Sequence, residues 1–206
     1  MTARAAGILV AVLALAGAPP RALPAEPLVS TRALLAALRP AGRAEATLRL
    51  GRRDPLTGDS TSLRGRLVLE QPRLARLELE DGERLTLRED GGDWLQPATR
   101  QLVRAGARSA AGALVWWGAL LDPRATGIQE RRLGPREFLL SRADAGDART
   151  QRIALGADGL PRRLTVETGA GERVEYLLTR WRFTRPRGPA DFRLAAPAGY
   201  EVVEMP

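Results

Sequence analysis

The chain has 206 residues, enough for one domain with a sizeable core. It contains no Cys, His or Lys, which excludes disulfides, thiolate and histidine catalysis, the usual zinc sites and lysine chemistry of the P-loop or Schiff-base kind. Its 32 arginines outnumber 24 acidic residues, for a net charge of +8. Acidic residues nevertheless alternate with the arginines, which indicates a solvated mixed surface and not a stripe that binds nucleic acid.

The N-terminus has the layout of a secretory signal peptide. Arg4 precedes the uncharged apolar run Ala5–Ala18, and prolines and small residues follow as far as Ala25. The run is shorter than the roughly 20 residues that a membrane-spanning helix needs. We therefore expect a signal peptide over residues 1–25 and a single periplasmic domain over residues 26–206.

The predicted mature chain opens with a short amphipathic helix. Ser30 is the expected N-cap, and Pro40 is expected to end the helix. Between them, Leu34, Leu35 and Leu38 fall on one face.

The stretches Arg43–Gly51 and Leu63–Pro97 alternate between apolar and charged residues. This period of two predicts a strand followed by a run of short antiparallel strands. The turn sequences Gln71-Pro72, Asp81-Gly82 and Asp90-Gly91-Gly92 separate the runs. One side of this meander is leucine-rich, so we expect half of a β core with an apolar concave face.

The second half of the chain begins with the stretch Ser109–Leu121, which is apolar nearly all round. This pattern predicts a helix that is buried or faces a ligand. Asp122–Arg136 is predicted to be a loop, and Asp191–Val203 an extended tail. Further strands are predicted at Arg100–Val103, Glu137–Arg142, Gln151–Leu155, Pro161–Thr168 and Arg173–Phe183. About ten strands and two helices indicate one α+β domain.

Four short motifs follow one another along the chain: Gly65–Arg73, Asp90–Trp94, Asp158–Pro161 and Asp191–Val203. In this order and spacing they resemble the outer-membrane lipoprotein carrier family, the LolA-like periplasmic proteins. The resemblance implies an unclosed antiparallel β-barrel of ten or eleven strands, with a helical lid over its concave apolar face. It also implies a monomer without cofactor or metal. Its cargo would be an acylated lipoprotein or lipid, taken from an inner-membrane transporter and passed to an outer-membrane acceptor.

The sequence departs from the family at the turn before Pro72. The family has an arginine there that holds the lid closed, and this chain has Gln71. An amide lacks the charge and the five donors of a guanidinium. Arg73 and Arg76 are candidates to replace that arginine; otherwise the lid is held differently.

The resemblance also selects the residues that we expect to contact acyl chains. On the sheet these are Leu67, Leu69, Leu77, Leu79, Leu85, Leu87 and Trp94, and on the lid they are Leu34, Leu35, Leu38, Leu114, Val115, Trp116, Trp117 and Leu120. Ordinary core packing is the alternative for each of them, because alternating leucines occur in any half-buried sheet. Trp116 and Trp117 point about 100° apart on a helix, so one of them is expected at the cavity or its mouth.

Two functions remain open at this point. The first is a periplasmic carrier of acyl chains, and the second is a lipid- or lipoprotein-sensing module on the same scaffold. An enzyme is not expected, because the chain has neither a nucleophile–histidine pair nor a G-x-S-x-G or G-x-G-x-x-G motif.

Overall fold

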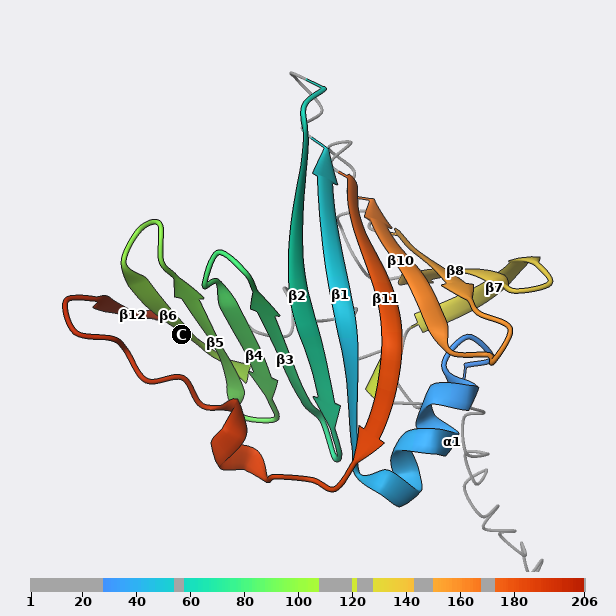
Figure 1. Cartoon of the computed structure of the whole chain (residues 1–206), viewed down its shortest axis with the longest axis horizontal. Coiled ribbons are helices and arrows are strands. Elements are labelled where there is room, and N and C mark those ends of the chain that lie inside the picture. Colours follow the sequence, from blue (N-terminus) through green and yellow to red (C-terminus); the bar gives the residue numbers. More distant parts are fainter. Residues whose placement is uncertain are drawn as a thin grey trace, which may run out of the picture.

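The computed structural model describes residues 28–53, 58–107, 120–121, 128–142, 150–167 and 173–205. The predicted signal peptide and most of the predicted helix Ser109–Leu121 lie outside these ranges. Within these ranges, twelve strands form one sheet in the order β12-β6-β5-β4-β3-β2-β1-β11-β10-β9-β8-β7 (Figure 1). The strands are β1 Arg43–Arg53, β2 Ser60–Glu70, β3 Leu74–Leu79, β4 Arg84–Arg88, β5 Gly91–Gln96, β6 Gln101–Gly106, β7 Ile128–Gly134, β8 Glu137–Arg142, β9 Thr150–Leu155, β10 Pro161–Glu167, β11 Arg173–Thr184 and β12 Glu201–Met205.

The sheet is curved but does not close on itself. All neighbouring strands are antiparallel except β12 and β6, which are parallel. Strands β12 and β7 are the two edges and do not pair with each other. The predicted unclosed antiparallel barrel is therefore confirmed, with twelve strands where ten or eleven were expected.

One segment of the prediction was wrong, and another was right only in part. Asp122–Arg136, predicted to be a loop, contains the edge strand β7, and the tail predicted to be extended contains a short 3-10 helix, η1 (Pro189–Phe192), followed by β12. Both strands lie at sheet edges and are largely solvent-exposed. An edge strand need not alternate between apolar and polar residues, so the sequence pattern does not reveal it.

Helix α1 (Arg32–Ala41) follows the predicted leucine pattern but has different ends. Thr31, and not Ser30, is the N-cap residue, and it makes no side-chain capping bond. Pro40 lies within the last turn, where it has no N–H to donate to the carbonyl of Ala36, and the helix ends one residue later, at Ala41. Gly42 then adopts φ +85°, and its N–H donates to the Leu38 carbonyl at 2.7 Å.

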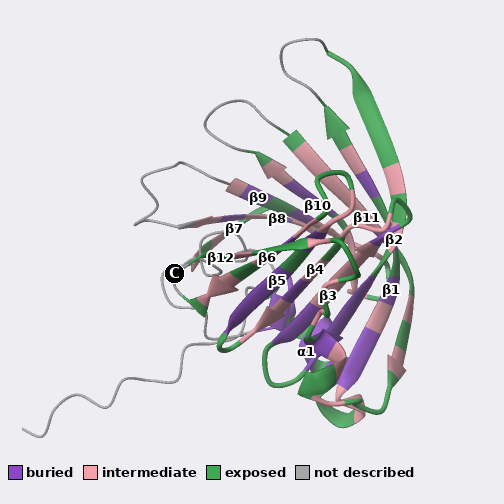
Figure 2. Cartoon of the chain, turned by 90° about the vertical axis from the view of Figure 1, so that its left-hand side faces the viewer, coloured by how far each residue is buried: buried purple, intermediate pink, exposed green. Residues whose placement is uncertain are grey.

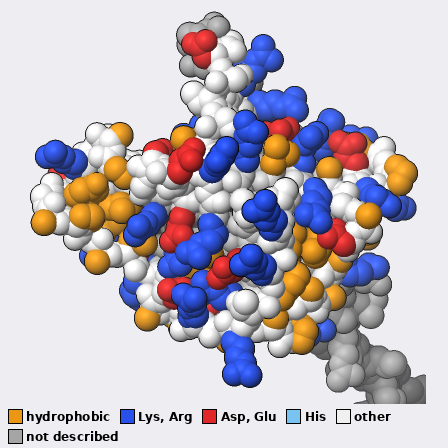
Figure 3. Space-filling model, in the orientation of Figure 1, with side chains coloured by type: hydrophobic (Ala, Val, Ile, Leu, Met, Phe, Trp, Pro, Cys, Tyr) orange, Lys and Arg blue, Asp and Glu red, His pale blue; other side chains and the backbone are white. Residues whose placement is uncertain are grey.

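The sheet has an apolar inner, concave face and a charged outer, convex face. The inner leucines of α1 pack with Ala44, Leu48 and Leu178 in one continuous core. Figure 2 shows this buried zone along the central strands, with exposed residues toward the strand ends and edges. The outer face shows arginines interspersed with acidic residues (Figure 3), as the alternation in the sequence predicts.

The outer face is crossed by the chain between β11 and β12, residues 185–200, here called the C-terminal strap. Its Phe192 is fully buried against Val68 and Leu74 of the outer face. The guanidinium groups of Arg43 and Arg76 each lie 5.9 Å from the centre of the Phe192 ring. The strap is thus held by a second apolar cluster between two cations.

Candidate functional site

Rows of apolar side chains cross the inner face from the centre of the sheet to the β12 edge. Because residues paired across neighbouring strands point to the same side of a sheet, the strand registers define these rows. One row is Ala46, Leu67, Leu77, Leu85, Trp94, Val103 and Val203, and the next is Ala44, Leu69, Ala75, Leu87, Gly92, Ala105 and Met205. No charged residue interrupts either row.

Burial decreases along these rows. Leu67 and Leu69, near α1, are fully buried. Leu77, Leu85 and Leu87 are half-buried against the core, and Trp94 is 40% exposed. The apolar surface therefore continues from the packed core into a region that water reaches.

Trp94 occupies the exposed part of this surface with its only polar side-chain atom satisfied. Its indole N–H donates to the Glu83 carboxylate at 2.7 Å. Glu83 lies in the turn between β3 and β4, where its own N–H donates to Asp81 at 3.0 Å. The bond fixes the ring orientation, and an apolar ligand can contact the ring without leaving a buried donor unpaired.

The other half of the inner face carries residues that the sequence analysis did not name. Leu164, Ile153 and Phe138 continue the apolar surface through β10, β9 and β8. Trp181 and Phe183 of β11 stack with ring centres 6.5 Å apart, and Trp181 donates to the Pro161 carbonyl at 2.9 Å. Their spacing by two residues in β11 was a signal that could have placed them on one face.

The N-terminal end of α1 is bound to the edge strand β7 by one carboxylate. Glu130 accepts a hydrogen bond from Val29 N–H at 2.8 Å and from Ser30 N–H at 2.9 Å. The carboxylate replaces the expected side-chain cap of Ser30, whose hydroxyl is buried without a partner. It thereby connects segments 100 residues apart in sequence. Nothing in the local sequence signals this contact, because it depends on the position of β7.

The predicted lid residues are only partly described. Leu34, Leu35 and Leu38 are buried on α1, and Leu120 belongs to the same core. Leu114, Val115, Trp116 and Trp117 lie outside the described residues. Of the predicted sheet residues, Leu79 is also buried.

The structure shows where Gln71, which occupies the family's arginine position, and Arg76, a candidate to replace that arginine, lie. Gln71 is exposed in the turn between β2 and β3, and its backbone N–H donates to the Gly42 carbonyl at 3.1 Å. Arg76 points to the outer face, where it donates to the Asp191 carbonyl at 2.6 Å. The suggestion that Arg76 replaces the family's arginine is therefore wrong, since it binds the C-terminal strap on the opposite side of the sheet.

The outer face holds a buried ionic network that anchors the strap. Arg43, with a side chain 1% exposed, donates to Glu70 at 3.1 Å and to Asp191 at 2.8 Å. Glu70 also accepts from the backbone N–H groups of Arg187 and Gly188, at 3.0 and 2.7 Å. The hydrogen bond from Arg43 lowers the pKa of Asp191 despite the opposing effect of burial. These opposite charges attract one another and hold the strap against the outer face.

A separate polar pocket of about 330 Å³ lies between β4–β6 and the strap. Its three arginines are all paired: Arg88 with Asp93 at 2.8 Å, Arg104 with Glu204 at 3.5 Å, and Arg193 with Asp90 at 2.8 Å. The pocket thus offers no uncompensated charge to a ligand. Among the described residues, no group of three or more acidic side chains is placed to hold a metal ion.

No protein-family profile and no curated protein sequence matches the chain. Solved structures do resemble it. An uncharacterised conserved protein from Thermus thermophilus is 18% identical, with a TM-score of 0.48, over 86% of this chain and 99% of that one.

A LolA superfamily protein is among the similar structures. This protein, from Nitrosomonas europaea, is 10% identical, with a TM-score of 0.44, over 80% of this chain and 97% of that one. The Mycobacterium tuberculosis lipoprotein LppX is 15% identical, with a TM-score of 0.38, over 77% of this chain and 95% of that one.

Proposed function

We propose that this protein binds the acyl chains of a lipoprotein or related lipid on its inner face and carries them through the periplasm toward the outer membrane. The observation that supports this most strongly is the uninterrupted apolar surface that runs from the buried Leu67 to the exposed Trp94. A surface of this kind suits flexible hydrocarbon, which requires area and no directed polar contact.

The energetics of a carrier favour such a surface. Each methylene group removed from water contributes roughly 0.8 kcal/mol, so an acyl chain requires a long apolar surface. A carrier must also release its cargo, and half-buried positions such as Leu77, Leu85 and Leu87 offer contact without full enclosure. Within the described part of the chain, no helix has the length and apolarity needed to cross a membrane.

A sensing module on the same scaffold is the second candidate. It would bind the same cargo but would not transfer it, so binding alone does not distinguish the two. Transfer of a labelled acylated peptide from loaded protein to acceptor vesicles does, because a carrier releases its cargo to the vesicles and a sensor keeps it.

Cargo is best identified from protein purified without detergent from the periplasm of a bacterial host. Lipids and acylated peptides extracted from it are measured by mass spectrometry. We expect acylated species in stoichiometric amount with the wild type and depletion with Leu87→Asp. The matched control is Leu177→Asp, which changes a half-buried leucine on the outer face between Arg49 and Arg163 of the neighbouring strands. Wild-type protein without acylated species, or equal loading of both variants, would contradict the proposal.

A further inference from the structure

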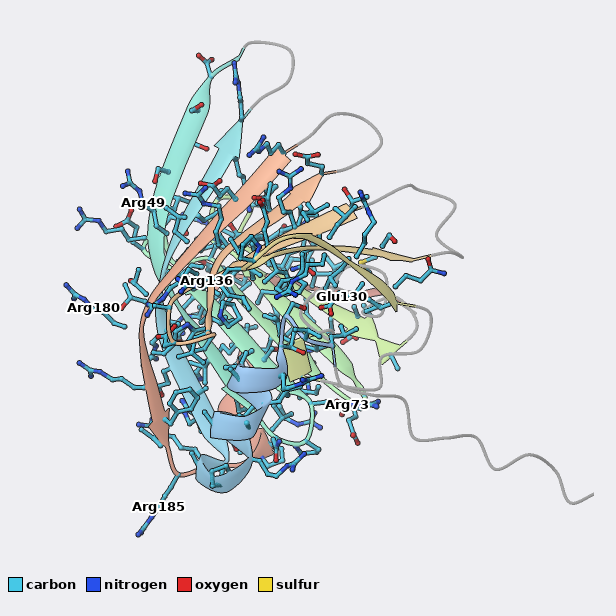
Figure 4. The ribbon with its side chains drawn as sticks, turned by 90° about the vertical axis from the view of Figure 1, so that its right-hand side faces the viewer. Arg49, Arg73, Glu130, Arg136, Arg180 and Arg185 are labelled. Atoms are coloured by element: carbon cyan, nitrogen blue, oxygen red, sulfur yellow. The ribbon has the colours of Figure 1, made fainter. Side chains whose placement is uncertain are left out.

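Four arginines are concentrated where β11 ends and the C-terminal strap begins. Arg180, Arg182, Arg185 and Arg187 fall within eight residues that contain no acidic residue. All four are exposed, and none forms an ion pair with another described residue. Figure 4 shows Arg180 and Arg185 projecting from the outer side of the sheet, away from the concavity.

A β-bulge places Arg180 on this surface. Strict alternation after the inward-facing Leu178 would point Arg180 into the apolar face. The register of β11 against β1 shifts between Glu45 and Thr47, and Arg180 has φ +54°. The extra residue keeps Trp181 in the core and turns Arg180 outward, which is how a bulge redirects a side chain. A non-glycine residue at positive φ is uncommon and costs free energy.

The carboxylates closest to this segment are already bound by other arginines. Glu45 pairs with Arg43 at 2.9 Å, and Asp191 pairs with Arg43 at 2.8 Å and with Arg76 at 3.4 Å. Glu70 is 1% exposed and binds the strap from beneath. The charge of Arg187 nevertheless acts on Asp191, and Arg182 lies opposite Glu45 in the strand register, so these carboxylates offset part of the arginine charge. The four arginines form no ion pair of their own with a described residue, and they leave this surface with a net positive charge, unlike the polar pocket near β12.

We propose that Arg180, Arg182, Arg185 and Arg187 form a docking surface for the anionic headgroups of a phospholipid bilayer. Guanidinium groups bind phosphate oxygens in a bidentate manner, and several of them on one surface match a plane of phosphates. Trp181 and Phe183, the aromatic residues between them, face inward and cannot stack on nucleic-acid bases. The surface points away from the apolar inner face, so membrane docking does not depend on acyl-chain binding.

The test measures sedimentation of the full mature chain with vesicles of equal parts phosphatidylglycerol and phosphatidylcholine, and with vesicles of phosphatidylcholine alone. Each arginine near an anionic surface contributes about five-fold in affinity. The quadruple Arg→Gln variant of the four residues should therefore lose binding to anionic vesicles by about a hundred-fold or more. A control variant carries Arg84→Gln, Arg100→Gln, Arg131→Gln and Arg136→Gln, four exposed arginines elsewhere on the molecule. Its net charge is the same, and its binding should stay within a few-fold of the wild type.

The outcomes separate clearly. Equal losses in the two quadruple variants would show that net charge alone drives binding and would overturn the proposed surface. Binding of the wild type that does not depend on phosphatidylglycerol would also overturn it. If the quadruple variant does not fold, Arg185→Gln, which lies in the strap outside any strand, provides the same test with an expected loss of about five-fold. Loss of vesicle binding with intact acyl-chain binding would support this surface whether or not the protein is a carrier.

Discussion

Replacing Glu130 should detach the N-terminal end of α1 from β7. The change to Ala removes both acceptors for Val29 N–H and Ser30 N–H, now at 2.8 and 2.9 Å. A hydrogen bond to a charged group contributes about 1.5–3 kcal/mol when buried. Val29 is exposed and Glu130 is half-buried, so water can replace part of the lost hydrogen-bond energy. We expect Glu130→Ala to lower the free energy of unfolding by about 2 kcal/mol and Glu130→Gln, which keeps one acceptor, by about 1 kcal/mol.

Urea-induced equilibrium unfolding measures the free-energy change, and hydrogen exchange at the two amides locates it. The matched control is Glu137→Ala on the neighbouring strand β8. Glu137 forms one exposed ion pair with Arg152 at 3.4 Å, and such pairs contribute about 0–1 kcal/mol. Equal destabilisation by Glu130→Ala and Glu137→Ala, with unchanged exchange at Val29 and Ser30, would refute the assignment of Glu130 as the link between helix and sheet.

Two further predictions concern the network beneath the C-terminal strap. Glu70→Leu removes one of the three carboxylates that bind the buried Arg43, and also the acceptor of the Arg187 and Gly188 N–H groups, and should cost about 3–5 kcal/mol in urea unfolding. The double variant with Arg43→Met should recover the part of that loss that comes from the buried guanidinium; an additive double variant would contradict the coupling. The hydrogen bond from Arg43 lowers the pKa of Asp191 in the folded protein. The ionised Asp191 therefore stabilises the fold fully above the ordinary carboxyl pKa near 4, and this stabilisation is lost as the pH falls through the lower folded-state pKa. Urea midpoints from about pH 5 downward should therefore fall further for the wild type than for Asp191→Asn, and parallel curves would count against this linkage.

The sequence predicted the parts of the fold that repeat a local pattern. Alternation in Leu63–Pro97 and in Arg173–Phe183 reflects one apolar and one solvated face, and both stretches form strands. Turn residues such as Asp81-Gly82 marked the boundaries, because glycine tolerates the φ of +88° found at Gly82. The edge strands β7 and β12 lack such a pattern, since neither face of an edge strand is fully buried.

The site was predictable only where it coincides with that alternation. The inward positions of Leu77, Leu85 and Leu87 follow from the period of two. The contact of Glu130 with α1 does not, because it joins residues 100 positions apart in the sequence. The outward position of Arg180 was hidden for a different reason: a single extra residue in β11 reverses the alternation that strand prediction assumes.

The most direct test of the central claim is the titration of a fluorescent fatty acid into delipidated protein. The wild type should bind it, and Leu77→Asp and Leu87→Asp should each weaken binding by about ten-fold or more, the effect of removing one leucine contact from an apolar surface. Leu177→Asp on the outer face should bind like the wild type. Unchanged affinity in both inner-face variants, with all three variants folded, would contradict acyl-chain binding on the inner face.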